Sequence, residues 1–191
     1  MILGILASSI SGSKAVTNSY ESIATVSVGV GGTAAAEFTS IPSTYSHLQI
    51  RAIGKSDSNT NTFETTRIQF NSDTGANYSW HQLYTVNGTV YAGAGTSASL
   101  MYSFDFPFSG SNYTNIFGAG VIDILDYANT NKYKTMRTLG GVDSNSASVD
   151  YGLNFVSGNW RSTNAITSIK IYPQSGNWAQ YTHFALYGIK A

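Results

Sequence analysis

The three histidines of the chain have the widest chemical repertoire, because imidazole can ligate a metal or act as a base near neutral pH. His47, His81 and His183 each lie in a strand-like segment beside aromatic residues. Catalysis or metal binding would need carboxylate or serine partners, and the sequence places none nearby. We therefore expect each histidine to be partly buried and hydrogen-bonded to the backbone.

Two further patterns resemble chemical sites but favour turns. Asp123 and Asp126 could suggest the carboxylate pair of a glycosidase. Residues three apart on one strand point to opposite faces, so we expect Asp123 to face outward and Asp126 to open a turn. The loop Asn71–Asn77 spaces oxygen ligands as a calcium loop does, but it lacks the downstream glutamate. With no Walker A, HExxH, GxSxG or GxGxxG pattern, we predict no catalytic residue, no metal and no cofactor.

The tryptophans are the one constellation that could mark a ligand site. Trp80, Trp160 and Trp178 accompany thirteen tyrosines. Sugar-binding sandwiches stack exposed aromatic rings on the apolar faces of sugars. The preferred interpretation is that these rings fill the core or a subunit interface, where aromatic side chains dominate the buried area. Glycan stacking on the three tryptophans is the alternative.

The composition indicates a neutral protein that meets other surfaces. Only 10% of its 191 residues are charged, and the formal net charge is zero. Without a basic stripe, electrostatic binding of nucleic acid is not expected. The chain has no cysteine, which excludes disulfides, thiol chemistry and cysteine-ligated zinc. No apolar run is long enough for a transmembrane helix, so membrane insertion is not expected.

The start of the chain is apolar. The segment 1–7 could pass for the core of a signal peptide, but no Lys or Arg precedes it and no A-x-A cleavage pattern follows. Residues 8–19 are rich in serine and show no core-forming pattern. We therefore expect residues 1–19 to be an extended anchoring arm that docks on a partner, and residues 20–191 to be one domain. The anchoring residues are Met1, Ile2, Leu3, Ile5 and Leu6.

Hydrophobic residues alternate with period two along most of the chain, which is typical of strands. Turn-forming Gly, Asn, Asp and Ser clusters separate the alternating segments, and Asn87-Gly88 is the strongest hairpin signal. The segment 91–97, rich in glycine and alanine, is expected to be an exposed loop. Strands are expected near 20–28, 34–40, 47–53, 66–70, 78–86, 98–106, 121–125, 132–142, 150–157, 168–172 and 184–188.

Strands at this spacing predict an all-β protein with a single antiparallel β-sandwich, and the leading topology is a jelly roll. Less than about a tenth of the chain should be helical, since helical periodicity is almost absent. The alternation also predicts which side chains point inward. The expected core contains Leu48, Ile50, Ile68, Phe70, Ile122, Ile124, Ile169, Ile171, Phe184 and Leu186.

Several long stretches are familiar when taken together. They are Leu3–Ser9, Phe38–Arg51, Phe70–Tyr78, Ile122–Thr135, Trp160–Ile169 and Phe184–Lys190. Through them the chain resembles, nearly from end to end, a widespread family of small virion structural proteins of tailed bacteriophages. Members of this family are described as structural, tail or decoration proteins. The resemblance implies a place in the virion and carries over no catalytic residue.

The position within a virus particle can be argued physically. A tail fibre needs a shaft, and the sequence has neither heptads nor short β-repeats. We therefore expect a non-enzymatic capsid decoration or cement subunit, acting as a homo-oligomer with a trimer as one candidate state. Its partner would be another virion protein such as the major capsid protein. The alternative is a tail-associated receptor-binding protein that recognises a host surface glycan. A glycan hydrolase is retained only because sandwiches can host one.

Overall fold

The structure is a computed structural model that describes residues 19–59, 63–86, 88–107, 114–144 and 152–190. Within these ranges the chain forms strands and turns and no helix, which confirms the expected all-β class. The strands are β1 (Tyr20–Ser27), β2 (Ala36–Phe38), β3 (His47–Gly54), β4 (Phe63–Phe70), β5 (Tyr78–Val86), β6 (Thr89–Ala98), β7 (Met101–Pro107), β8 (Gly118–Leu125), β9 (Lys134–Val142), β10 (Gly152–Trp160), β11 (Ile169–Pro173) and β12 (His183–Ile189).

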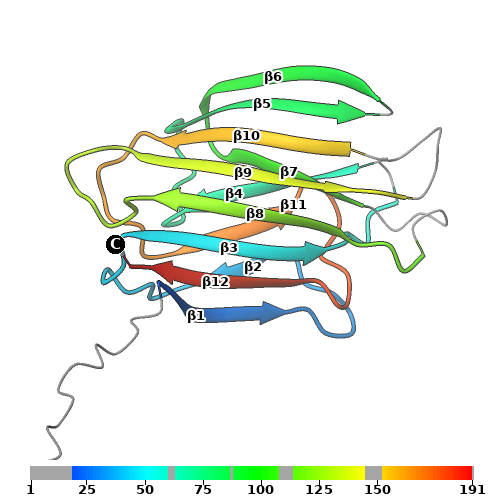
Figure 1. Cartoon of the computed structure of the whole chain (residues 1–191), viewed down its shortest axis with the longest axis horizontal. Coiled ribbons are helices and arrows are strands. Elements are labelled where there is room, and N and C mark those ends of the chain that lie inside the picture. Colours follow the sequence, from blue (N-terminus) through cyan, green and yellow to red (C-terminus); the bar gives the residue numbers. More distant parts are fainter. Residues whose placement is uncertain (1–18, 60–62, 87, 108–113, 145–151, 191) are drawn as a thin grey trace, which may run out of the picture.

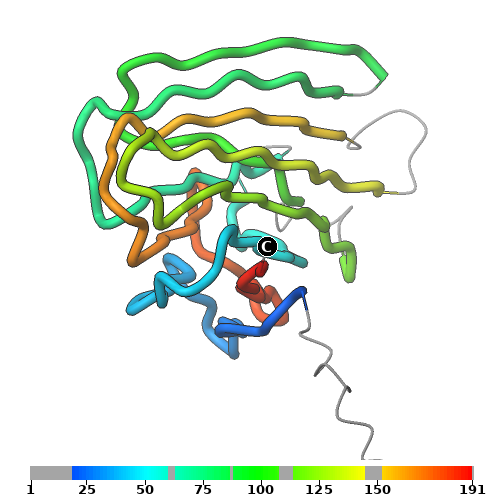
Figure 2. The backbone as a smooth tube through the Cα atoms, turned by 60° about the vertical axis from the view of Figure 1, so that its left-hand side comes forward, coloured from blue at the N-terminus to red at the C-terminus, as the bar shows by residue number. Residues whose placement is uncertain are grey.

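The strands form two antiparallel sheets. The large sheet has eight strands in the order β1-β12-β3-β8-β9-β10-β5-β6, and the small sheet has four in the order β2-β11-β4-β7. Figure 1 looks onto the large sheet, with the small sheet behind its central strands. Strands β5 and β6 extend beyond the small sheet as a long hairpin, which is visible from both directions (Figures 1 and 2).

The two sheets share one hydrophobic core. Period-two alternation places every second residue of β3, β4, β8 and β12 inside, so the buried side chains of the two layers meet face to face. The core assignment from the sequence is confirmed, because each expected residue is buried: Leu48, Ile50, Ile68, Phe70, Ile122, Ile124, Ile169, Ile171, Phe184 and Leu186.

Strand β6 corrects one sequence-based expectation. Residues 91–97 lie in a strand rather than in a loop: residues 91–95 pair with β5 in register, and the register shifts before Ala98 pairs with Tyr78. Val86 pairs with Thr89, so the hairpin expected at Asn87-Gly88 is confirmed, with Gly88 at a φ of 78°. The small residues of β6 make room for large side chains of β5. A Cβ atom on Gly95 would lie 2.5 Å from Nε1 of Trp80, for example.

Glycines on the inner face of the large sheet receive the aromatic side chains of β7. A Cβ atom on Gly120 would lie 2.4 Å from Cε1 of Phe104, and one on Gly140 would lie 2.5 Å from Cγ of the same ring. Gly120 and Gly140 are direct cross-strand partners on β8 and β9. Phe106 meets Gly118 in the same way, with 2.8 Å between a Cβ atom and Cδ1. These glycines therefore allow β7 to approach the large sheet closely.

Replacement of Gly120 by alanine should destabilise the protein. The added methyl group would overlap Phe104, and overpacking of this kind costs about 1–3 kcal/mol of unfolding free energy. Gly29→Ala is the matched control, because no atom lies within 4 Å of the position of its Cβ, and a change within about 0.5 kcal/mol is expected there. Chemical denaturation measures both variants. Equal stability of the two would show that Phe104 can move aside.

Candidate functional site

The outer face of the large sheet carries an exposed apolar surface. Cross-strand pairing places Val121, Leu139, Phe155 and Leu83 in one row across β8, β9, β10 and β5. The adjacent row holds Ile53, Ala119, Gly141 and Leu153. Leu139, Leu153 and Phe155 are 57%, 61% and 51% exposed. We call the set Ile53, Leu83, Val121, Leu139, Leu153 and Phe155 the apolar face.

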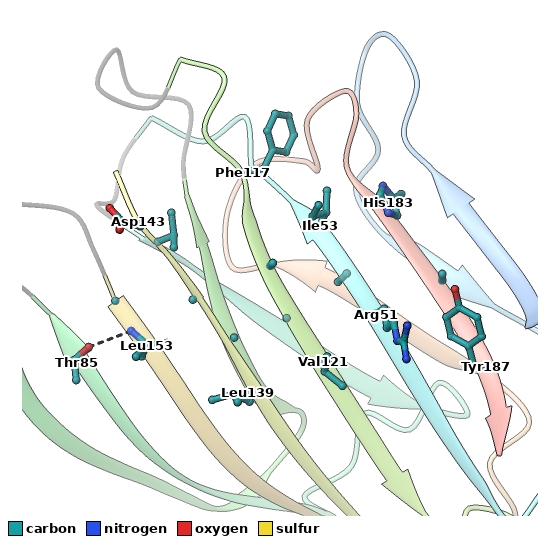
Figure 3. Close-up of a pocket in the computed structure, with 18 of the residues that line it drawn as sticks. Arg51, Ile53, Thr85, Phe117, Val121, Leu139, Asp143, Leu153, His183 and Tyr187 are labelled. Carbon is teal, nitrogen blue, oxygen red and sulfur yellow. Dashed lines mark hydrogen bonds between the residues drawn. The ribbon is translucent and has the colours of Figure 1, made fainter. Parts of the chain in front are cut away.

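The apolar face contains a hollow of about 1140 Å³. Its floor is low where the outward residues of β8 and β9 are Ala119 and Gly141, which pair with each other. Larger side chains stand around these two, with Ile53 on one side and Leu153 on the other (Figure 3). The hollow therefore results from a local change in residue size along two neighbouring strands. The other apolar side chains of its wall include Phe117, Val121 and Leu139.

One corner of the hollow is positively charged. The guanidinium of Arg51 lies 5.4 Å from the ring centroid of Tyr187 and 5.7 Å from that of Tyr20, within cation–π range. Its Nε donates to Oε1 of Gln49 at 3.1 Å. Asp143 and His183 also line the hollow (Figure 3). A bound molecule would therefore meet an apolar floor with a few polar groups at its edge, which is the usual composition of a binding site.

A polar row borders the apolar face on the side away from the hollow. Asp123 accepts a hydrogen bond from Nε2 of Gln49 at 2.9 Å and forms an ion pair with Nε of Arg137 at 3.1 Å. These residues pair across β3, β8 and β9, and the row continues to Ser157 and His81. The apolar face thus lies toward one end of the sheet, beyond this polar row.

The outer face of the small sheet differs in character. Lys170 forms an ion pair with Glu37 at 3.7 Å and lies 5.5 Å from the ring centroid of Tyr172. Gln69 extends along the same sheet and donates to the carbonyl of Ser99. Polar and charged groups therefore cover this face, whereas the end of the large sheet exposes aliphatic side chains. The outer face of the small sheet is therefore suited to contact with water, and the apolar face of the large sheet is suited to contact with another apolar surface.

Two of the three tryptophans cannot bind a sugar. Trp160 is 2% exposed and Trp178 is fully buried, each within the common core. Trp160 stacks on Tyr78 with ring centroids 6.3 Å apart, and Trp178 donates its Nε1 hydrogen to the carbonyl of Ile171. The hypothesis of glycan stacking is therefore wrong for Trp160 and Trp178, because neither ring presents a face to solvent.

Trp80 remains partly exposed. Its indole stacks on Tyr102 with centroids 4.2 Å apart and also lies against the backbone of Gly95. The two rings line a second, smaller hollow of about 500 Å³ together with Thr74 and Ser97. Glycan stacking at Trp80 stays a prediction, although contacts within the protein already cover part of the ring.

The histidines differ from one another. Nδ1 of His47 accepts a hydrogen bond from the backbone N–H of Asp126 at 3.0 Å, as expected for a partly buried histidine. His81 and His183 are exposed on the outer face of the large sheet, so that expectation is wrong for them. Asp126 also forms an ion pair with Lys132, whose hydrogen bond holds the carboxyl pKa below its usual value. Asp123 faces outward and Asp126 lies in a turn at a φ of 50°, as expected.

The loop 71–77, which resembles a calcium loop in sequence, has a structural role. Both carboxylate oxygens of Asp73 accept hydrogen bonds from Nδ2 of Asn77, and Oδ2 also accepts from Nε1 of Trp160 at 2.7 Å. The backbone N–H of Gly75 completes the set at 2.8 Å. Burial raises the pKa of Asp73, but the hydrogen bonds from Trp160, Asn77 and Gly75 outweigh burial and lower it below its ordinary value.

Among the described residues, no three His, Asp or Glu side chains lie close enough together to hold a metal ion. The described part of the chain also contains no helix that is long and apolar enough to cross a membrane. The anchoring residues Met1, Ile2, Leu3, Ile5 and Leu6 lie outside the described part of the chain.

The residues of the apolar face escaped prediction for a specific reason. In β10, Leu153 and Phe155 face outward while Asn154 and Val156 face inward, so both faces of the strand carry apolar side chains. Alternation alone cannot tell which set is inside when both sets are apolar. The signal that could have found the site is this double set in β10, together with the small residues of 118–120 and 140–141.

Comparisons with models of known protein families, with curated proteins and with solved structures find no match to this chain.

Asp73→Ala should destabilise the protein in a pH-dependent way. Loss of the carboxylate leaves the buried indole N–H of Trp160 without its acceptor, which costs about 1–3 kcal/mol of unfolding free energy at pH 7. Because the folded pKa lies below the ordinary value of 3.8, the stabilisation is complete above that value and is lost as the pH falls through the folded pKa.

Denaturation curves at pH 7 and in acid therefore test the role of Asp73. The difference between wild type and variant should narrow in acid. Glu37→Ala, which removes only an exposed ion pair, is the control and should cost no more than about 1 kcal/mol. A constant difference across pH would contradict the assigned role of the carboxylate.

Proposed function

We propose that this chain is a non-enzymatic structural subunit of a bacteriophage particle, and that it works by burying its apolar face against another protein of the particle. The observation that carries the proposal is the cross-strand row of Val121, Leu139, Phe155 and Leu83, in which Val121 is partly buried and the other three side chains are exposed. Exposed apolar patches of this kind mark interaction sites more often than chance exposure. The resemblance of long sequence stretches to phage virion proteins supplies the setting.

The energetics favour contact through this face. Complete burial of a Leu or Phe side chain contributes about 1.5–3 kcal/mol, so the half-exposed Leu139, Leu153 and Phe155 can each add roughly 1 kcal/mol. Association costs several kcal/mol, which means that a stable contact needs much of the apolar face at once. Display in many copies on a regular lattice meets that need, since weak contacts add up when each subunit makes more than one.

We further propose a jelly roll with two inserted hairpins as the topology. Jelly rolls consist of two Greek keys and occur in viral capsid proteins. If β1, β2, β3, β4, β7, β8, β11 and β12 are taken as its eight successive strands, the first, eighth, third and sixth are neighbours in the large sheet. The second, seventh, fourth and fifth make the small sheet. This order supports the proposal, with β5–β6 and β9–β10 as additions that widen the large sheet.

Particle incorporation tests the function. Leu139→Glu and Phe155→Glu each place a charge on the apolar face without touching the core, so the folded protein should persist while its occupancy on particles falls at least tenfold. Leu125→Glu is the matched control, because Leu125 lies on the outer face of β8 but outside the apolar face. Quantitative mass spectrometry of purified particles gives the occupancy. Full occupancy with both variants would exclude the apolar face as the docking surface.

Quantitative mass spectrometry of the particles also distinguishes a location on the capsid from a location in the tail. A capsid decoration or cement subunit, which we propose, should be present at roughly the copy number of the major capsid protein or a simple fraction of it. A copy number of about three to twelve for each particle would place the chain in the tail, because tails follow low rotational symmetry.

Receptor binding is the second candidate function, and the exposed edge of Trp80 beside the smaller hollow favours it. A sugar there would contact Trp80 and Tyr102. A glycan array with the purified protein should then show binding to a host surface polysaccharide that Trp80→Ala removes. Absence of binding, or binding that Trp80→Ala leaves unchanged, would eliminate this candidate.

A further inference from the structure

We propose that the hollow of the large sheet binds the apolar N-terminal segment, residues 1–7, of a neighbouring copy of this chain. The inference rests on the proposed function, since it names the partner of the same docking surface. It joins two features that are otherwise unconnected. One is the hollow over Ala119 and Gly141, and the other is the cluster of large apolar residues at the beginning of the sequence.

The apolar character of residues 1–7 matches that of the hollow. Met1, Ile2, Leu3, Ile5 and Leu6 are all aliphatic, and no charged side chain occurs before Lys14. The floor and wall of the hollow are largely apolar, and its volume of about 1140 Å³ is slightly above the usual range of sites that hold small ligands. A short peptide with several aliphatic side chains fits such a space. A charged or hydroxyl-rich segment would leave its polar groups without partners over Ala119 and Gly141.

Strand β1 begins at the end of the large sheet that lies away from its own hollow. Tyr20 begins β1 opposite Ile189, which in turn pairs with His47 at the start of β3. Ile53 and the hollow lie six positions further along β3, about 20 Å away at the usual rise of a strand. Strand β1 runs toward the hollow end, so the chain enters it from the opposite end of the sheet (Figure 1). To reach its own hollow, the segment would have to turn back along the length of the sheet, whereas a neighbour beyond the start of β1 is reached without such a reversal, and this favours a neighbouring copy.

The connecting segment is long enough to reach another subunit. Residues 8–19 span at most about 3.3–3.6 Å each when extended, or roughly 40 Å in total. A neighbour placed end to end beyond the start of β1 lies within that distance. Each copy would donate one segment and accept another, which is a heterologous contact that closes into a ring or continues as a chain of subunits.

Disulfide trapping tests the contact directly, because the natural chain has no cysteine. Full-length protein with Leu3→Cys is mixed with full-length protein carrying Ala119→Cys, under mild oxidation. A disulfide needs Cα atoms within about 7 Å, so it forms only if the segment enters the hollow. We expect the mixed dimer to form at least tenfold faster than with Leu125→Cys, which lies on the same face of β8 at its other end. Ile2→Cys and Ile5→Cys cover a shift in register.

The double variant with Leu3→Cys and Ala119→Cys in one chain identifies the donor. Disulfide-linked oligomers are expected, whereas a cross-link within one chain, at high dilution, would overturn the assignment to a neighbour. Ala119→Trp fills the hollow while keeping the surface apolar, and its introduction into the Leu139→Cys protein should slow trapping with the Leu3→Cys protein at least tenfold. The proposal would be overturned if Ile2→Cys, Leu3→Cys and Ile5→Cys all formed disulfides with Ala119→Cys no faster than with the control Leu125→Cys.

Failure here is distinguishable from failure of the proposed function. If trapping fails but Leu139→Glu still prevents incorporation into particles, the hollow binds a different protein of the particle and only the present inference is wrong. If trapping succeeds but Leu139→Glu protein incorporates normally, the contact between copies exists and the apolar face is not required for the particle.

Discussion

Close contact between β7 and a group of glycines on the large sheet is the constraint on which the rest of the structure depends. Phe104 lies against Gly120 and Gly140, and Phe106 lies against Gly54 and Gly118. Glycine weakens an isolated strand, so its repeated use here needs a packing reason, and the aromatic rings provide it. The contact joins the small sheet to the centre of the large one.

The same segments also shape the outer surface. Gly118-Ala119-Gly120 on β8 and Gly140-Gly141 on β9 are small on both faces of the sheet. Inside, they admit the rings of β7, and outside, Ala119 and Gly141 leave the floor of the hollow low between Ile53 and Leu153. A larger side chain at the inward positions Gly120 or Gly140 would push β7 away. A larger side chain at the outward positions Ala119 or Gly141 would fill the hollow. Fold and candidate site therefore share a sequence constraint.

The core and the candidate site differ in how far the sequence predicts them. Ile50 was correctly assigned inside because the polar Gln49 and Arg51 alternate with it, and a strand with one polar set and one apolar set buries the apolar set. The outer position of Leu153 and Phe155 was not predictable, since apolar residues occupy both faces of β10. Only the pairing of β10 with β9 and β5 in the folded sheet determines which of its two faces is exposed to solvent.

Two other errors have physical causes of their own. Strand β6 was expected to be a loop because Gly and Ala have low strand propensity, yet its small residues are what allow β5 to place Trp80 over it. Trp160 and Trp178 were candidates for sugar binding because a sequence does not show which aromatic rings are covered. Asp73 reaches Trp160 from far along the chain, and such contacts exist only in the folded protein.

A density map of the assembled particle at side-chain resolution would test most directly whether the apolar face is the docking surface. We expect the outer face of the large sheet to be covered in the particle, with Leu139, Leu153 and Phe155 in contact with another polypeptide. A map in which these three side chains face solvent, while the small sheet or another surface makes the contacts, would contradict it.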